Sequence, residues 1–215
     1  MHLTCLAIFT AVLAFGPNAS ASAPDVGAPS VQKTTARSKV ETYLAAHDVA
    51  TAADLHAIEP APEKSLMAIA LDTHAEGLTR ARAVAALRLV PSPAVLEFLG
   101  KLVEKNAKAT DAVDRLIVRR AAVALGFLPG APNAPEQLAR LFDNDDAEVR
   151  LDAVIGLGLT RADTAPDILR RQLAVEPVAR VRDQIERQLR TLAETVPAPA
   201  KAPAGPQKAP MRSDW

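Results

Sequence analysis

The sequence predicts an all-α protein made of repeated helix pairs. The 215-residue chain is 49% hydrophobic, and alanine and leucine supply much of this apolar content. It has 9 glycines and few runs of β-branched residues, whereas an all-β sandwich needs many turns and strand formers. Apolar residues recur at helical spacing through the middle of the chain, and the same columns return at regular intervals.

The N-terminal segment predicts export. Residues 3–16 are apolar but fall short of the roughly 20 residues that a bilayer span needs. Pro17 and a run of small residues follow. We therefore expect a signal peptide over residues 1–21, cleaved after Ala21, and a periplasmic or secreted product with no transmembrane segment in the mature chain. The alternative is an N-terminal helix that belongs to the fold.

The charge balance argues against a nucleic-acid partner, and the cysteine content argues against a disulfide. The chain has 25 basic and 25 acidic residues. This balance gives no overall attraction to nucleic acid, so we expect no nucleic-acid partner. The single cysteine, Cys5, lies within the expected signal peptide, so we expect no disulfide in the mature chain.

Two proline-rich segments are expected to flank one helical domain. The segment 22–37 has turn-forming residues without an apolar stripe, and prolines recur through the segment 195–215. Both compositions predict disordered, extended chain that acts as a spacer, although a peptide ligand for a partner is an alternative. The helical repeat domain is expected over residues 38–194.

Within this domain, irregular helices come first and a repeat follows. We expect helices over residues 38–46, 51–58 and 62–71. The repeat appears when four leucines are placed in register, because a second apolar column then aligns four residues earlier on the same helix face. The first helix of each repeat is expected at residues 79–87, 117–126, 149–158 and 181–189.

Second helices are expected between these first helices, near residues 93–106, 135–142 and 164–174. Each has an N-cap signal in the sequence. Ser92 precedes the first of them, Asn133 precedes the next, and Asp163 or Thr164 precedes the last. Asp145 or Asp146 is expected to open the third first-helix in the same way.

Small and aromatic residues are assigned to structural roles. Gly126, Gly156 and Gly158 are expected to accommodate the turns at the ends of first helices. Three aromatic residues, Phe98, Phe127 and Phe142, are expected to fill the core.

The third unit carries a family resemblance. Val149, Arg150 and Ala153, followed by Leu157 and Gly158, resemble the HEAT repeat, especially the short bacterial HEAT-like form that is also seen in phycobilin lyases. The resemblance covers about residues 60–192. It implies a right-handed α-solenoid of antiparallel helix pairs with a concave surface that binds other proteins.

No pattern of catalytic residues accompanies these helices. His47, His56 and His74 have no metal-ligand spacing, and no nucleotide-binding or nucleophile motif is present. We therefore expect no catalytic residue, no cofactor and no metal, and we expect a non-enzymatic scaffold or adaptor. The recurring arginines Arg80 and Arg150, with Arg182, are expected to pair with acidic neighbours of the adjacent unit.

The expected partner is another protein of unstated identity. The row of second helices is expected to form the concave binding surface, with Arg170 and Arg171 as candidate protein-binding residues. One alternative is a lyase- or chaperone-like helper that acts on a cofactor-bearing protein. Another is an envelope-associated structural spacer.

Overall fold

The computed structural model describes residues 35–47, 49–131 and 133–195, and these ranges are all-helical. Ten α-helices and two short 3-10 helices form, with no strand in these ranges, which confirms the predicted all-α class. No helix in this part of the chain combines the length and the apolar character needed to cross a membrane. The expected signal peptide, the linker before residue 35 and the tail after residue 195 lie outside the described residues.

The three predicted N-terminal helices are present with nearly the predicted bounds. They are α1 (Ala36–Ala46), α2 (Ala52–Ile58) and α3 (Glu63–Leu71). The first begins at Ala36, inside the expected linker, because the Thr35 side chain accepts a hydrogen bond from the backbone N–H of Ser38 and caps the helix.

The repeated helices follow α3 in the predicted order. Two of them continue into short 3-10 turns at their C-terminal ends. The elements are α4 (Gly77–Ala86) with η1 (Leu87–Leu89), α5 (Pro93–Lys105), α6 (Ala112–Phe127), α7 (Ala134–Ala139) with η2 (Arg140–Asp143), α8 (Ala147–Thr160), α9 (Ala165–Leu173) and α10 (Ala179–Thr195).

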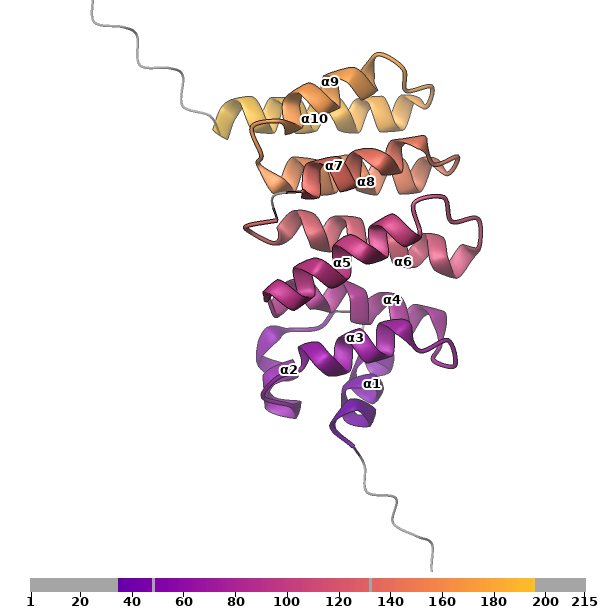
Figure 1. The fold of residues 1–215 in the computed structure, drawn as a ribbon, viewed down its shortest axis with the longest axis vertical. Coiled ribbons are helices and arrows are strands. Elements are labelled where there is room, and N and C mark those ends of the chain that lie inside the picture. The colour runs from indigo at the N-terminus through magenta and orange to yellow at the C-terminus, as the bar shows by residue number, and fades with distance from the viewer. Residues whose placement is uncertain (1–34, 48, 132, 196–215) are drawn as a thin grey trace, which may run out of the picture. The chain divides into compact units, whose positions relative to one another are not determined.

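The helices form two rows, which Figure 1 shows as successive pairs. Each of α3, α5, α7 and α9 packs against the helix that follows it, and we call these helices the α3–α9 row. The helices α4, α6, α8 and α10 contact one another in sequence, and we call them the α4–α10 row. Contacts along the α4–α10 row are far more extensive than contacts along the α3–α9 row.

Glycines explain the close contact between α6 and α8. A Cβ atom on Gly126 would overlap the backbone of Gly156, and a Cβ atom on Gly156 would overlap the carbonyl of Ala122. Gly158, also within α8, lies equally close to the Gln188 side chain of α10. The prediction that these glycines accommodate turns is therefore wrong, since they lie inside helices, where Gly126 and Gly156 allow the backbones to approach and Gly158 leaves room for the Gln188 side chain. Within the described ranges, the glycine with positive φ is Gly130, in the α6–α7 turn.

Helix capping agrees with the sequence at two positions and differs at two others. Ser92 accepts a hydrogen bond from Val95 N–H, and Asp146 accepts one from Glu148 N–H, as predicted. Asn133 and Thr164 make no side-chain cap, so the predicted caps of α7 and α9 are wrong. The backbone at these two residues is not extended, whereas a capping side chain normally acts from an extended residue.

The predicted apolar columns lie in the core, with one aromatic exception. Phe98 and Phe142 are half-buried against the core, as expected. Phe127 is 50% exposed, so its prediction as a core residue is wrong. It is the last residue of α6 and lies on the face of that helix directed to solvent. The buried members of the two columns are Ala83, Leu87, Ala121, Leu125, Ala153, Leu157 and Ile185.

Candidate protein-binding site

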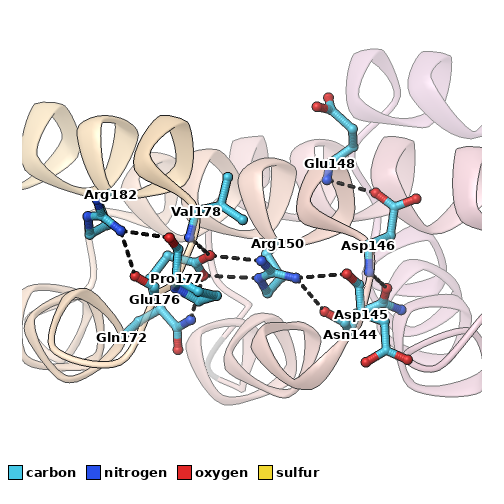
Figure 2. A network of polar contacts seen from close by, with 10 residues as sticks. All are labelled: Asn144, Asp145, Asp146, Glu148, Arg150, Gln172, Glu176, Pro177, Val178 and Arg182. Carbon is cyan, nitrogen blue, oxygen red and sulfur yellow. Dashed lines mark hydrogen bonds and ion pairs between the residues drawn. The ribbon is translucent and has the colours of Figure 1, made fainter.

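The recurring arginine of the third unit is held in a buried ion pair. Arg150 lies in α8, and its Nε and Nη2 atoms donate to the two carboxylate oxygens of Glu176 at 3.0 and 2.8 Å. The Arg150 side chain is 8% exposed and that of Glu176 is 0% exposed. Figure 2 shows this pair at the centre of a polar network that joins the loop before α8 to the loop before α10.

The other polar groups of the pair are also engaged. Arg150 Nη1 donates to the carbonyls of Asn144 and Asp145, at 2.8 and 3.0 Å (Figure 2). The Glu176 carboxylate accepts further hydrogen bonds from the Gln172 side chain and from Val178 N–H. Burial raises the pKa of Glu176, but the hydrogen bonds that its charged form accepts outweigh burial and leave this pKa below the ordinary value.

Arg182 occupies the same position in the next unit and makes a related contact. Its Nη1 atom donates to the carbonyls of Glu176 and Pro177, at 3.1 and 2.8 Å (Figure 2). Arg80 donates from Nε to the carbonyl of Ala70 at 3.2 Å. The acidic partner that we predicted for this position is confirmed for Arg150, whereas Arg80 and Arg182 donate to backbone carbonyls. All three arginines therefore bind loops or helix ends of the protein itself.

The solvent face of the α3–α9 row carries charges that are paired locally. The pairs are Lys101 with Glu97 at 2.6 Å, Arg140 with Glu104 at 3.1 Å and Arg170 with Asp167 at 2.7 Å. All six side chains are at least two-fifths exposed. Each of these pairs joins one positive and one negative side chain, so the three pairs carry no net charge.

The two arginines that the sequence singled out lie on this face. Arg170 and Arg171 are both exposed on α9. Arg170 belongs to the ion pair with Asp167, and Arg171 donates from Nε to the carbonyl of Asp167 at 3.4 Å. Arg171 also lines a shallow cleft of about 350 Å³ between α7 and α9, together with Ile168. Arg170 is not among the residues that line this cleft.

Two helices of the α4–α10 row, α6 and α8, have apolar residues on their solvent side. Partly or fully exposed apolar residues recur at helical spacing on α6 and on α8. Because α6 and α8 pack side by side, we group these partly or fully exposed side chains and call them the apolar face. Its members are Leu116, Val123 and Phe127 of α6 with Leu151, Ile155 and Leu159 of α8.

Ion pairs also join the helices that carry the apolar face. Arg119 of α6 donates to Asp152 of α8 at 2.7 Å and lies 3.3 Å from Glu148. Glu148 also pairs with Arg180 of α10 at 2.6 Å. These pairs link three successive helices of the α4–α10 row.

A cleft of about 410 Å³ lies beside α4 and α6 in the same row. Its rim includes two exposed apolar residues, Val49 (71% exposed) and Leu78 (42% exposed). We call it the arginine cleft, because three arginines are among its lining residues. The full lining is Leu44, His47, Val49, Ala50, Leu78, Ala81, Arg82, Ala85, Ala86, Arg88, Leu89 and Arg120.

The three arginines of the cleft are held differently. Arg82 donates from Nη1 to the carbonyls of Leu44 and Ala45, near the C-terminal end of α1, at 3.0 and 3.1 Å. The guanidinium of Arg88 lies 5.0 Å from the centre of the Phe127 ring, which is a cation–π distance. Arg120 is exposed on α6, and the described residues offer it no carboxylate within ion-pair distance.

Sequence reasoning missed this face and this cleft, although a signal was present. Helix α6 has apolar residues on its solvent side as well as on its buried side, and α8 does too. Apolar residues gathered on the solvent side of a helix can mark the contact surface of a partner. We had assigned all the apolar residues of these helices to the core.

The histidines form no metal site in the part of the chain that the structure describes. His47 stacks on Tyr43 with ring centroids 4.5 Å apart, and His56 contacts the carbonyl of Pro60. No three potential ligand side chains gather among the described residues.

The fold and the surface together define an all-α protein of packed helix pairs with an apolar, arginine-bordered face. Comparison of the chain with family models, with curated proteins and with solved structures finds no match. Any inference about function therefore depends on the surface and the contacts described above.

Proposed function

We propose that this protein is a non-enzymatic, exported scaffold or adaptor that binds another protein through the solvent face of its α4–α10 row. In this proposal the helix pairs form a HEAT-like, right-handed α-solenoid of antiparallel pairs. The α4–α10 row is its concave side, because helices on the inside of a curved stack approach one another more closely than those outside. The extensive contacts along this row support the assignment.

The apolar face is the observation that carries the proposal. Six apolar side chains on two adjacent helices keep part of their surface in water, and Phe127 keeps half of it. Contiguous apolar surface of this kind on a soluble domain marks interaction sites, because covering it releases the water that it orders. The α3–α9 row also has exposed apolar residues, such as Leu71, but its exposed charges, such as Arg170 and Asp167, are already paired with each other. The proposed binding surface therefore moves away from Arg170 and Arg171.

A site-specific crosslinking experiment tests this function. A photoreactive phenylalanine analogue is placed at Ile155 on the apolar face, and at Glu97 on the charged face as the matched control. In producing cells, we expect the Ile155 position to give a saturable crosslink to one protein. That protein is then identified, purified and titrated against the wild-type chain and the Ile155→Glu variant.

The expected result is a loss of binding in Ile155→Glu with an unchanged circular dichroism spectrum, because Ile155 is only partly buried. Equal crosslinking from Glu97, or wild-type affinity of Ile155→Glu for the purified partner, would refute the proposed surface.

Export is tested separately by intact mass. The protein recovered from fractionated producing cells should have the mass of a chain that begins at Ser22, in the periplasmic or culture fraction. Recovery of the uncleaved chain from the cytosol would exclude the exported form of the proposal and leave the binding surface unaffected.

A further inference from the structure

We propose that the arginine cleft binds an acidic peptide segment of the protein partner. One apolar side chain of that segment enters the cleft, and its flanking carboxylates bind Arg88 and Arg120. This inference rests on the proposed function, because it names the chemistry of the partner that the α4–α10 row would hold.

The shape and lining of the cleft suit an apolar side chain. The buried residues Leu44, Ala81 and Ala86 line it, and Val49 and Leu78 stand exposed beside them. The volume of about 410 Å³ lies within the range of specific binding pockets in proteins. A leucine or phenylalanine side chain placed there would cover the two exposed apolar residues and be covered in turn.

The charge at the rim selects acidic neighbours for that side chain. Arg88 and Arg120 are both exposed, and neither has a carboxylate partner among the described residues. An arginine fork binds a carboxylate through two parallel hydrogen bonds, which gives direction as well as charge. Other arginines of the same row, such as Arg119 and Arg180, already have carboxylate partners.

Two contacts prepare the cleft for binding. The Phe127 ring, 5.0 Å from the Arg88 guanidinium, limits the freedom of that side chain before a ligand arrives. Arg82 donates to two carbonyls near the end of α1 and so holds that helix against α4. Arg82 is therefore assigned to the wall of the cleft, and the ligand carboxylates are assigned to Arg88 and Arg120.

A peptide titration tests the inference directly. The probe is a short fluorescein-labelled peptide with one leucine between glutamates, and its matched control has glutamines in place of the glutamates. Fluorescence anisotropy with the purified full chain should show binding of the glutamate peptide that weakens as salt is added. The affinity for the glutamine peptide should be lower by a factor of about ten or more, because charge-assisted hydrogen bonds are lost.

Protein variants locate the binding site. The Arg88→Glu/Arg120→Glu double variant should lose the glutamate peptide, and it should keep its thermal unfolding temperature because both side chains are exposed. The double variant Arg170→Glu/Arg171→Glu makes the same charge change on α9 and should bind the peptide like the wild type. Leu78→Ala should weaken binding of both peptides, because it removes apolar contact area.

Equal affinity for the two peptides, or an unchanged affinity in Arg88→Glu/Arg120→Glu, would overturn the inference. A comparable loss in Arg170→Glu/Arg171→Glu would also overturn it, because binding would then depend on net charge alone. If the partner captured at Ile155 binds Arg88→Glu/Arg120→Glu normally, the cleft inference fails and the proposed function stands. If peptide binding follows the prediction but Ile155 captures nothing, the apolar face fails and the cleft stands.

Discussion

The neighbouring helices α6 and α8 carry two arginines in opposite situations. Arg150 of α8 is 8% exposed in its side chain, and all its contacts are with groups of the protein itself. Arg120 of α6 is exposed beside a cleft, without a carboxylate partner among the described residues. An arginine therefore stabilises the fold at position 150, whereas at position 120 its charge is available to a ligand. The difference lies in what the fold brings to each guanidinium.

Removal of the buried carboxylate is the test of this contrast with the largest expected change in the free energy of unfolding. Glu176→Ala leaves the Arg150 charge buried without its partner, and we expect it to lower the free energy of unfolding by about 3–5 kcal/mol. Chemical denaturation measures the change. The matched control is Glu104→Ala, which breaks the exposed pair with Arg140 and should cost about 1 kcal/mol or less. Similar losses in both variants would contradict the distinction between buried and exposed pairs.

A second test concerns the backbone contact that positions α6 against α8. We expect Gly126→Ala to cost about 1–3 kcal/mol, because the new Cβ meets backbone atoms of α8 that cannot turn aside. Gly100→Ala in α5 is the control, since its Cβ meets only the flexible end of the Gln137 side chain. That variant should be neutral or slightly stabilising, because alanine favours helix more than glycine does. Thermal unfolding of the two variants shows whether backbone contact or helix propensity determines the effect of each substitution on stability.

The third test uses pH. The pKa of Glu176 is lower in the folded protein than its ordinary value of 4.5, so its stabilising contribution is complete above that value. It is lost as the pH falls through the lower pKa of the folded state. Glu176→Gln lacks this titration, and the stability gap between wild type and variant should therefore narrow as the pH drops below 4.5. A gap that is constant down to acidic pH would show that the charge of Glu176 does not stabilise the fold.

The smallest change in the free energy of unfolding is expected at the exposed arginine, Arg120. Arg120→Met should change the free energy of unfolding by about 0.5 kcal/mol or less, because the exposed guanidinium has no ion pair to lose. Denaturation under the same conditions as for Glu176→Ala makes the values comparable. A loss of several kcal/mol would mean that Arg120 is a structural residue, and it would remove one of the two cations assigned to the peptide.

Local features of the fold could be predicted because their causes are local. The periodic apolar residues place α4, α6, α8 and α10, and the hydroxyl of Ser92 starts α5 through a hydrogen bond three residues away. Each signal lies within one or two helical turns. The predicted caps at Asn133 and Thr164 failed where the backbone conformation, which sequence alone does not reveal, was unsuitable.

The candidate site was much harder to predict. Arg170 and Arg171 were chosen for their position on the last second helix, but Arg170 pairs with Asp167, three residues earlier on the same helix. Arg88 and Arg120 carry no motif, and they meet at one cleft only because α4 packs against α6. A cleft formed by separate helices has no signature within either of them.

The sequence by itself determined the helical class, the order of the elements and their approximate positions, because helix formation depends on residues that are close along the chain. The tertiary structure alone decided which side of each helix meets a neighbour. It placed Glu176 beside Arg150, made Gly126 a helix contact and left Phe127 half exposed beneath Arg88. These outcomes depend on how helices distant in sequence fit together, and close packing settles that fit only when all of them are present.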